Sequence, residues 1–247
     1  MTALAALTER TVLASVRDRD LLFAILAPAV TFVGFTLVLR NVIDTGGMSY
    51  AQYVLPAVVV QSMLLGALTT AERAASDQRA GWGVRLRTFP ISSAVPLMAR
   101  MLYCLFRGAL ALAAAITVAY VFGFRMTGGL LYAAAFVVIA LLLTLALSLG
   151  ADATGSFGWK MDAAGQLLLI PQLLLVLLST GMAPATAFPD WLEPFVLYQP
   201  VSQVTETLRG FAVGQVLGGN LAASLAWCVG LLVVFGVIAM RMQRRTQ

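Results

Sequence analysis

Residues 79–93 form the segment of this chain whose side chains are best suited to recognise another molecule. They read RAGWGVRLRTFPISS and lie between two long apolar runs. The residues that give the segment its character are Arg79, Gly81, Trp82, Gly83, Arg85, Arg87, Phe89 and Pro90. Arginine and aromatic side chains are common anchors of protein–protein interfaces, and glycine permits a sharp bend of the backbone. The combination predicts a short basic and aromatic element that docks into a groove on another protein.

Side chains that could do covalent or metal chemistry are sparse. The sequence has no histidine, which excludes histidine-based catalysis, metal ligation and proton relay. Cys104 and Cys228 lie inside apolar runs, without a metal-binding or disulfide pattern, and we interpret them as small core residues. The single lysine, Lys160, follows no glycine-rich phosphate-binding loop. Asp190 and Glu193 fit solvated loop charges, so we expect no catalytic residue, cofactor site or metal site in this chain.

The composition is that of a membrane protein. Of 247 residues, 60% are hydrophobic and only 11% are charged, whereas a soluble domain carries about 25% charged residues. The net charge is +5, but the basic residues stand at the ends of apolar runs rather than in one patch, so we expect no nucleic-acid partner. Residues 1–20 lack an uninterrupted apolar core and a small-residue cleavage site, which argues against a secretory signal peptide.

Six apolar runs are long enough to cross a bilayer, whose hydrocarbon core of about 30 Å needs roughly 20 helical residues. The runs are apolar throughout rather than alternating with polar residues, which favours helices over barrel strands. They cover residues 20–40, 51–75, 96–122, 128–151, 163–183 and 218–240. The sequence therefore predicts an all-α membrane protein with six transmembrane helices, folded as a single transmembrane domain over residues 1–247.

The distribution of basic residues predicts the orientation. With both termini inside, twelve basic residues lie on the cytoplasmic side and three outside, with Arg107 left within the third run. The cytoplasmic set is Arg10, Arg17, Arg19, Arg73, Arg79, Arg85, Arg87, Arg100, Lys160, Arg241, Arg244 and Arg245, and the outer set is Arg40, Arg125 and Arg209. This is the positive-inside pattern. Abundant alanine and a strong excess of arginine over lysine associate the chain with a GC-rich bacterial genome, so we expect a bacterial plasma membrane.

Two further segments do not fit simple spans. Residues 1–19 place charged and apolar residues in opposite sectors of a helical wheel, which predicts an N-terminal amphipathic helix in the membrane interface. A solvated N-terminal tail is the alternative. Residues 184–217 contain four prolines and several aromatic residues, which predicts short broken helices at the outer membrane surface. Within this segment, Glu206 and Arg209 have the i, i+3 spacing of a helical ion pair.

Polar residues inside the runs are candidates for lining a path through the membrane. They are Gln61, Gln166, Gln172, Ser179 and Thr180. Hydrogen bonding between helices is an equally good explanation, because amides and hydroxyls commonly join helices in lipid. Arg107 stands well inside the third run, where it could snorkel to the surface, pair with an acid or face a cavity. The sequence leaves these alternatives open.

In the predicted topology, residues 76–95 form a cytoplasmic loop between the second and third spans. Arg85 and Arg87 are not expected inside the bilayer, since placing an arginine at mid-membrane has an unfavourable free energy of about 3 kcal/mol or more. Trp82 and Phe89 are too apolar to prefer water. Docking to a partner explains both properties together. An ordinary basic loop with an interfacial aromatic residue is the alternative.

These residues carry a resemblance to a known family. Asp77, Gly81 and RLRTFPISS at 85–93 resemble the coupling loop of type-2 ABC exporter permeases, most closely the daunorubicin-resistance branch. In that loop an acidic residue and a glycine precede an arginine-rich stretch that ends in proline and a small polar residue. YQPVSQVTETLRGFAVG at 198–214 resembles the segment before the last span of the same family. The resemblance covers the whole chain. Phe89 departs from it, since relatives often carry leucine before the proline.

The resemblance implies the permease subunit of an ATP-driven exporter, which would move an amphiphilic drug or lipid and could confer antibiotic resistance. The export direction rests on the resemblance alone. Two copies of a separate ABC-type ATPase subunit would bind ATP and Mg²⁺, and a second permease, identical or homologous, would complete the membrane part. The residues implied in ATPase coupling are Asp77, Arg79, Gly81, Trp82, Arg85, Arg87, Phe89 and Pro90.

Two other classes of function remain as alternatives. A self-contained secondary transporter or channel predicts ionisable residues near mid-bilayer, and many transporter folds also contain an internal repeat. The sequence offers only Arg107 as a buried charge and no clear repeat. A scaffold that anchors another protein would leave the polar residues of the spans unexplained.

Overall fold

The structure is a computed structural model that describes residues 3–40, 47–81, 92, 94–156, 161–215 and 218–245. Within these residues all regular secondary structure is helical. The helices are α1 (Ala3–Arg17), α2 (Asp20–Leu39), α3 (Tyr50–Arg79), α5 (Ala94–Val121), α6 (Gly129–Gly155), α7 (Met161–Leu177), the short 3₁₀ helix η1 (Ala185–Ala187), α8 (Glu193–Tyr198), α9 (Pro200–Val213) and α10 (Gly218–Arg245). The expected all-helical class is confirmed.

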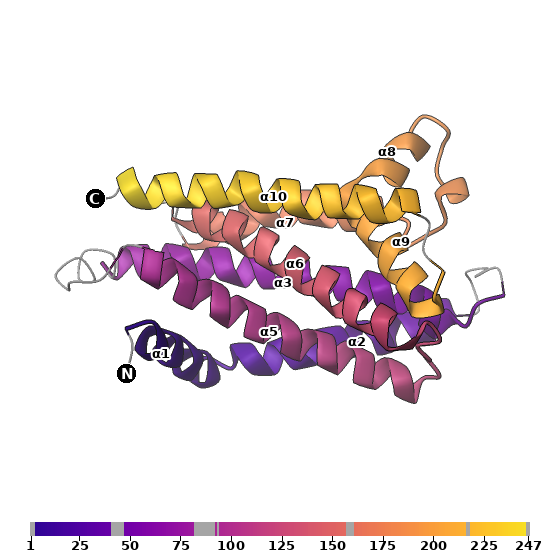
Figure 1. Cartoon of the computed structure of the whole chain (residues 1–247), viewed down its shortest axis with the longest axis horizontal. Coiled ribbons are helices and arrows are strands. Elements are labelled where there is room, and N and C mark those ends of the chain that lie inside the picture. Colours follow the sequence, from indigo (N-terminus) through magenta and orange to yellow (C-terminus); the bar gives the residue numbers. More distant parts are fainter. Residues whose placement is uncertain are drawn as a thin grey trace.

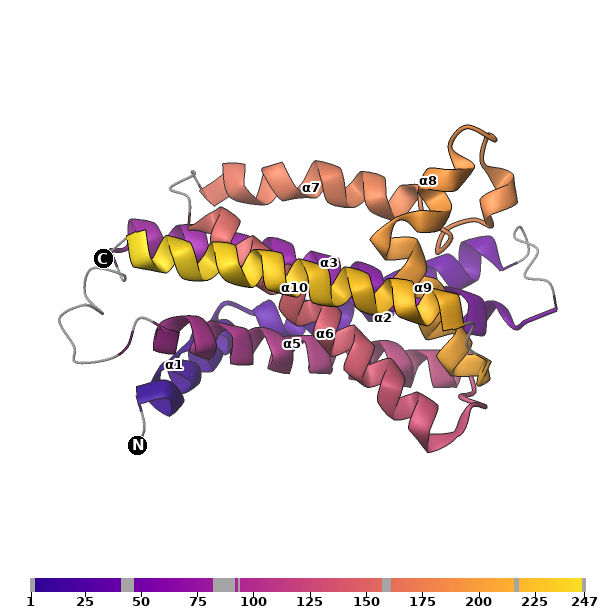
Figure 2. The same ribbon diagram turned by 45° about the horizontal axis from the view of Figure 1, so that its top comes forward.

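The long helices run back and forth along one axis (Figure 1). The start of α1, the end of α3, the start of α5, the end of α6 and the end of α10 gather at one end, while α8 and α9 lie at the other. We call the first the inner end and the second the outer end, after the predicted orientation. Figure 2 shows α7 along the outside of the bundle, where it packs mainly against α3.

Five helices among the described residues are long and apolar enough to cross a membrane: α2, α3, α5, α6 and α10. They correspond to five of the six predicted runs. The remaining run corresponds to α7, which has 17 residues and a shorter apolar stretch at Leu168–Leu177. Multiple membrane crossings are thus supported by length and composition, and the sixth span remains a prediction.

The fifth run was predicted to continue to residue 183, but α7 ends at Leu177. The physical reason lies in the hydrogen bonds that follow. The hydroxyl of Ser179 donates to the carbonyl of Val176 at 2.7 Å, and the N–H of Thr180 donates to the Ser202 hydroxyl of α9 at 3.1 Å. The backbone is therefore held by α9 instead of continuing the helical ladder.

Helix α3 is the centre of the fold. Of its apolar window 78% is buried, against 22% for α2 and 11% for α10. Ser49 and Gln52 begin the helix with a reciprocal capping box. The core forms where Val58 of α3 meets Phe32 of α2, Phe136 of α6 and Leu208 of α9, all fully buried. Helices α2, α5, α6, α7 and α9 therefore take their positions from α3.

Close approach between α3 and α6 depends on a glycine near the inner end. A Cβ atom added to Gly155 of α6 would lie 2.2 Å from the carbonyl oxygen of Ala71 in α3. A backbone carbonyl cannot rotate away as a side chain can, so this contact requires a residue without a side chain. Nearby, the amide of Gln78 donates to the carbonyl of Ser156 at 3.2 Å. The inner ends of α3 and α6 are consequently joined closely.

Helix α1 leaves the bundle at a sharp turn. Arg19, between α1 and α2, has φ 60° and ψ 14° in the left-handed region, which non-glycine residues rarely adopt. Ser15 of α1 is fully buried, whereas Leu13 and Val16 are exposed. An N-terminal helix is thus present as expected, and its location in the membrane interface remains a prediction.

Residues 184–217 form the short pieces η1, α8 and α9 in their described part. Pro200 begins α9, and Gly214 ends it with φ 80°. Trp191 and Tyr198 are exposed, as expected at a membrane surface, but Phe211 is buried. Helix α9 packs against α3, α6 and α10, and Phe211 contacts Tyr132 of α6. The position of this segment at the outer membrane surface stays a prediction.

We expect Gly155→Ala to lower the free energy of unfolding by about 1–3 kcal/mol, since an added methyl group must push α3 and α6 apart. The thermal midpoint of the detergent-purified protein measures this effect. Gly34→Ala is the matched control, because Gly34 is an exposed glycine of α2 with no atom within 4 Å of an added Cβ. Equal midpoints for the two variants would contradict the close contact.

Candidate functional site

The inner end carries the residues expected to contact a partner. Trp82, Arg85, Arg87, Phe89 and Pro90 lie outside the described residues. The other three predicted residues, Asp77, Arg79 and Gly81, are described by the structure. Asp77 is half-buried in the last turns of α3 and interacts electrostatically with Arg100, while Arg79 is exposed at the end of that helix. Gly81 has φ 68°, a left-handed value that glycine adopts freely, so the backbone turns there directly after α3.

A buried ion pair joins α5 to α6 close to this point. The guanidinium of Arg100 faces the carboxylate of Asp152 with two contacts, Nε to Oδ1 at 2.6 Å and Nη2 to Oδ2 at 3.0 Å. The side chain of Asp152 is 3% exposed and that of Arg100 is 24% exposed. Of the two contacts, Nη2 to Oδ2 is a hydrogen bond, while Nε and Oδ1 have no hydrogen-bond partner and form a charge contact only. A charge-assisted hydrogen bond is directional, so the pair restrains orientation as well as distance. It therefore sets how the inner halves of α5 and α6 lie against each other.

A second ionic cluster joins α2 to α3 and α5 around Asp20. Its carboxylate lies 3.1 Å from Nε of Arg107 and accepts a hydrogen bond of 2.5 Å from the Tyr103 hydroxyl. Arg73 of α3 approaches the same carboxylate at 3.6 Å and donates to the hydroxyl of Ser15 in α1 at 2.6 Å. The cluster therefore ties four helices together.

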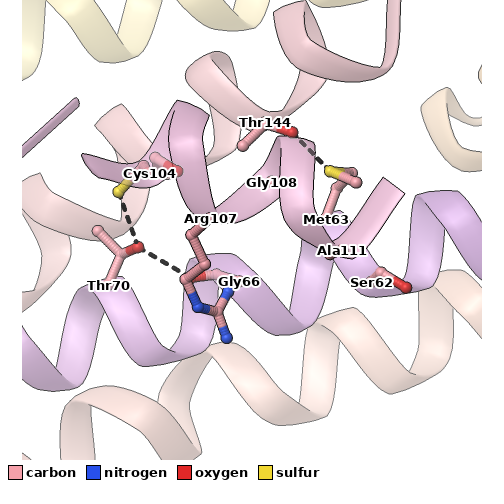
Figure 3. A pocket seen from close by; sticks show the side chains of 10 residues that line it. Ser62, Met63, Gly66, Thr70, Cys104, Arg107, Gly108, Ala111 and Thr144 are labelled. Carbon is pink, nitrogen blue, oxygen red and sulfur yellow. Dashed lines mark hydrogen bonds between the residues drawn. The ribbon is translucent and has the colours of Figure 1, made fainter. Parts of the chain in front are cut away.

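Arg107 also borders a small cavity enclosed by α3, α5 and α6 (Figure 3). The cavity holds about 10 Å³, enough for about one water molecule. Its lining residues are Ser62, Met63, Gly66, Thr70, Cys104, Arg107, Gly108, Ala111, Thr144 and Ser148. Of the alternatives for Arg107, the structure shows pairing with an acid and contact with a cavity. The cavity is far too small for an amphiphilic drug.

The five candidate path residues fall into two groups. Gln61 of α3 and Gln172 of α7 are half-buried, and Gln166 of α7 is exposed. Oε1 of Gln61 is buried without a hydrogen-bond partner. Ser179 and Thr180 are buried at the outer end of α7. None of the five lines the small cavity, and their role in a path remains a prediction.

The outer group belongs to a polar network around Arg209 of α9. Nη1 of Arg209 pairs with Glu206 at 2.6 Å, as the i, i+3 spacing predicted. Nη2 of Arg209 donates to the carbonyl of Tyr53 at 3.2 Å, and its guanidinium lies 4.0 Å from the centre of the Tyr53 ring. The Tyr53 hydroxyl donates to the carbonyl of Thr180 at 3.1 Å. This network attaches α9 and the end of α7 to α3.

Sequence reasoning missed the acidic partners of both inner clusters and the role of Tyr103. One signal was present: Arg100, Tyr103 and Arg107 follow i, i+3, i+7 spacing and so form a polar stripe on one face of an otherwise apolar helix. Such a stripe indicates polar partners on neighbouring helices. It does not identify Asp20 or Asp152 as those partners.

Comparison with known proteins decides the family. Residues 2–213 match the family described as ABC-2 type transporter. This chain belongs to the ABC-2 type transporter family. It is a multi-pass membrane permease, and the resemblance seen in the sequence is confirmed. In this family the permease has no nucleotide-binding site, so hydrolysis of ATP belongs to another subunit.

Relatives of this permease include three proteins named for drug resistance. The doxorubicin resistance ABC transporter permease protein DrrB of Mycobacterium tuberculosis is 31% identical over 237 residues, covering 90% of this chain and 82% of that protein. The probable doxorubicin resistance permease DrrC of the same organism is 26% identical, covering 87% and 78%. The daunorubicin resistance permease DrrB1 of Streptomyces coeruleorubidus is 24% identical, covering 91% and 80%.

We expect Asp20→Asn to lower the free energy of unfolding of the permease by about 3 kcal/mol, because it leaves Arg107 buried beside no negative charge. Thermal unfolding in detergent measures the loss. Asp18→Asn is the control. Its side chain is 66% exposed and lies 3.9 Å from Arg73, so the expected cost is about 0–1 kcal/mol.

A double variant separates the lost ion pair from a general effect at this site. Asp20→Asn combined with Arg107→Gln should cost less than the sum of the two single changes, because neither charge is then left alone. Strict additivity of the unfolding free energies would contradict coupling between Asp20 and Arg107.

Proposed function

We propose that this chain is the membrane subunit of an exporter for amphiphilic drugs, with lipids as the second class of cargo. The observation that carries the proposal is the match of nearly the whole chain to permeases named for doxorubicin and daunorubicin resistance. The broad apolar surface and the few polar side chains inside the bundle suit a substrate with both apolar and polar parts. Export follows from the resistance named for those relatives.

The energy source in this proposal is a separate ABC-type ATPase subunit, present in two copies, that binds ATP and Mg²⁺. Residues 76–95 form the coupling loop that docks into it, through the side chains named in the sequence analysis. Closure of the ATPase subunits on ATP moves this loop and shifts the equilibrium between two arrangements of the spans. Asp77, Arg79 and Gly81 support this proposal because they stand where α3 gives way to the loop.

A second permease, identical or homologous, completes the proposed membrane unit. Helix α7 supports this part because its exposed face is apolar along Leu169, Ile170, Leu173 and Leu174, yet Gln166 of the same helix is exposed as well. An amide facing lipid has no hydrogen-bond partner, which is costly in hydrocarbon. We infer that α7 is the sixth span and that it faces the partner permease and the transport path, where Gln166 and Gln172 meet polar groups.

The topology in this proposal keeps both termini in the cytoplasm. The ends of α3 and α6, the starts of α1 and α5 and the end of α10 then lie on the side of the ATPase. The basic residues of the predicted cytoplasmic set follow the positive-inside pattern in this orientation. The network around Arg209 then lies near the outer surface.

Transport by the purified complex tests the function. Inside-out vesicles that contain the permease and its ATPase subunit should accumulate doxorubicin when ATP and Mg²⁺ are added, and vesicles that contain the permease alone should not. Uptake by the permease alone, driven by an ion gradient, would replace the proposal with the secondary-transporter alternative.

Docking of the coupling loop gives a separate prediction. Arg85→Glu should reduce copurification of the ATPase subunit by at least about tenfold, equivalent to about 1.4 kcal/mol of binding free energy. Arg40→Glu is the matched control, because Arg40 is an exposed arginine at the outer end of α2. Copurification of Arg85→Glu at the level of Arg40→Glu would show that the loop is only a basic membrane-proximal segment.

A further inference from the structure

Helix α5 occupies a special position relative to the coupling loop. It begins at Ala94 and α3 ends at Arg79, so both helices extend into residues 76–95, the segment predicted as the loop. Any movement of the loop must therefore pass into the membrane through α3, α5 or both. Helix α3 is buried at the centre of the bundle and packs against α2, α5, α6, α7 and α9. Helix α5 packs on fewer helices and is the one better placed to move.

The inner half of α5 is held by ion pairs on two sides. Arg100 binds Asp152 of α6 with two contacts, at 2.6 and 3.0 Å. Arg107, seven residues further on, binds Asp20 of α2 at 3.1 Å. Charge-assisted hydrogen bonds between arginine and carboxylate act over a narrow range of distance and angle, unlike apolar contacts, which allow helices to slide. The pairs therefore define the position of α5 in this conformation.

Asp152 is linked to the other end of the loop as well. It stands three residues before Gly155, which contacts the backbone of Ala71 in α3. Gln78 of α3 bonds to the carbonyl of Ser156, the residue after α6. The inner end of α6, which carries Asp152, thus packs on α3, while Arg100 lies on α5. The pair joins α5 to α6, so α6 connects the two helices on either side of the coupling loop.

A buried ion pair contributes little to stability compared with an apolar contact of the same size, because both charges lose their hydration. Stability alone gives a weak reason for placing Asp152 at 3% side-chain exposure. Asp77, in the last turns of α3, also acts electrostatically on Arg100. A positional role explains the burial of Asp152, its hydrogen bond with Arg100 and the neighbouring Asp77 together.

We propose that Arg100 and Asp152 are positioning residues that transmit movement of the coupling loop from α5 to α6, and so couple ATP hydrolysis to transport. The inference rests on the proposed function. When the loop pulls the start of α5, the pair moves the inner half of α6 with it. Without the pair, α5 moves alone, and the ATPase subunit hydrolyses ATP without moving substrate.

The test uses the complete complex of permease and ATPase subunit in vesicles. Asp152→Asn should keep copurification and basal ATP hydrolysis close to wild type, and should lower doxorubicin accumulated per ATP hydrolysed by about tenfold or more. The charge swap Arg100→Asp with Asp152→Arg should recover much of this ratio. Asp190→Asn, an exposed carboxylate of the outer end, should behave as wild type.

A milder variant covers the case in which Asp152→Asn does not fold. Arg100→Lys keeps the charge but loses the planar fork, so it should assemble normally and still transport less per ATP than wild type. Wild-type transport per ATP in Arg100→Lys, or in a folded and assembled Asp152→Asn complex, overturns the proposal. So does a folded charge swap without recovery.

A readout that needs no substrate separates this inference from the proposed cargo. Cys104 lies one turn after Arg100 and is buried beside Thr70 of α3, with Sγ 3.3 Å from the Thr70 hydroxyl. In a Cys228→Ala background it is the only thiol. Trapping the complex with ATP and vanadate should change its rate of labelling by a small methanethiosulfonate in the wild type and not in Asp152→Asn. An equal change in both overturns the inference, even if doxorubicin is not the cargo.

Discussion

A charge that enters the helix bundle of this permease has to be neutralised there, because neither lipid nor a packed helix interface can hydrate it. The buried arginines Arg107 and Arg209 each have a carboxylate partner, Asp20 and Glu206. These pairs lie toward opposite ends of the bundle. Asp20–Arg107 joins α2 to α5, whereas Glu206–Arg209 lies within α9. Apolar contacts bring the spans together but do not fix the rotation of a helix about its own axis or its position along the bundle. Ion pairs between helices restrain both.

Apolar contacts and specific contacts occupy different parts of α3. Helix α3 is surrounded by apolar side chains along its middle, where Val58 and its neighbours exclude water. Near the inner end the contacts become specific, through the bare backbone of Gly155 and the carboxylate of Asp152. A displacement of the inner end would therefore act first on the directional contacts of Gly155 and Asp152, and only then on the apolar core. This order would allow a displacement to be transmitted while the core stays packed.

Much of the fold could be predicted from the sequence because the bilayer imposes a length and a composition on each span. The predicted boundaries of α2 and α5 differ from the observed ones by at most two residues, and the i, i+3 spacing of Glu206 and Arg209 predicted their ion pair. The end of α7 could not be predicted, since it depends on a hydrogen bond from Thr180 to Ser202. That partner becomes visible only when α9 is placed in the bundle.

The docking element stays a prediction, because Trp82, Arg85, Arg87, Phe89 and Pro90 lie outside the described residues, whereas the ion pairs beside it came from the structure. A basic and aromatic loop between two spans indicated a docking element. The partner of Arg107 could not be chosen, because Asp20 is 87 residues away and any carboxylate near the inner end would have served. Long-range ion pairs leave no periodic trace in a single sequence. The heptad spacing of Arg100 and Arg107 was the only local sign of them.

The left-handed residue Arg19 determines how α1 is joined to the bundle. Ser15 before it and Asp20 after it both contact Arg73, so α3 holds the chain on either side of the bend. The direction of α1 is thereby tied to the rotation of the central helix. If α1 lies in the membrane interface, as the sequence predicts, a force that lipid headgroups exert on its 15 residues would reach α3 at Arg73.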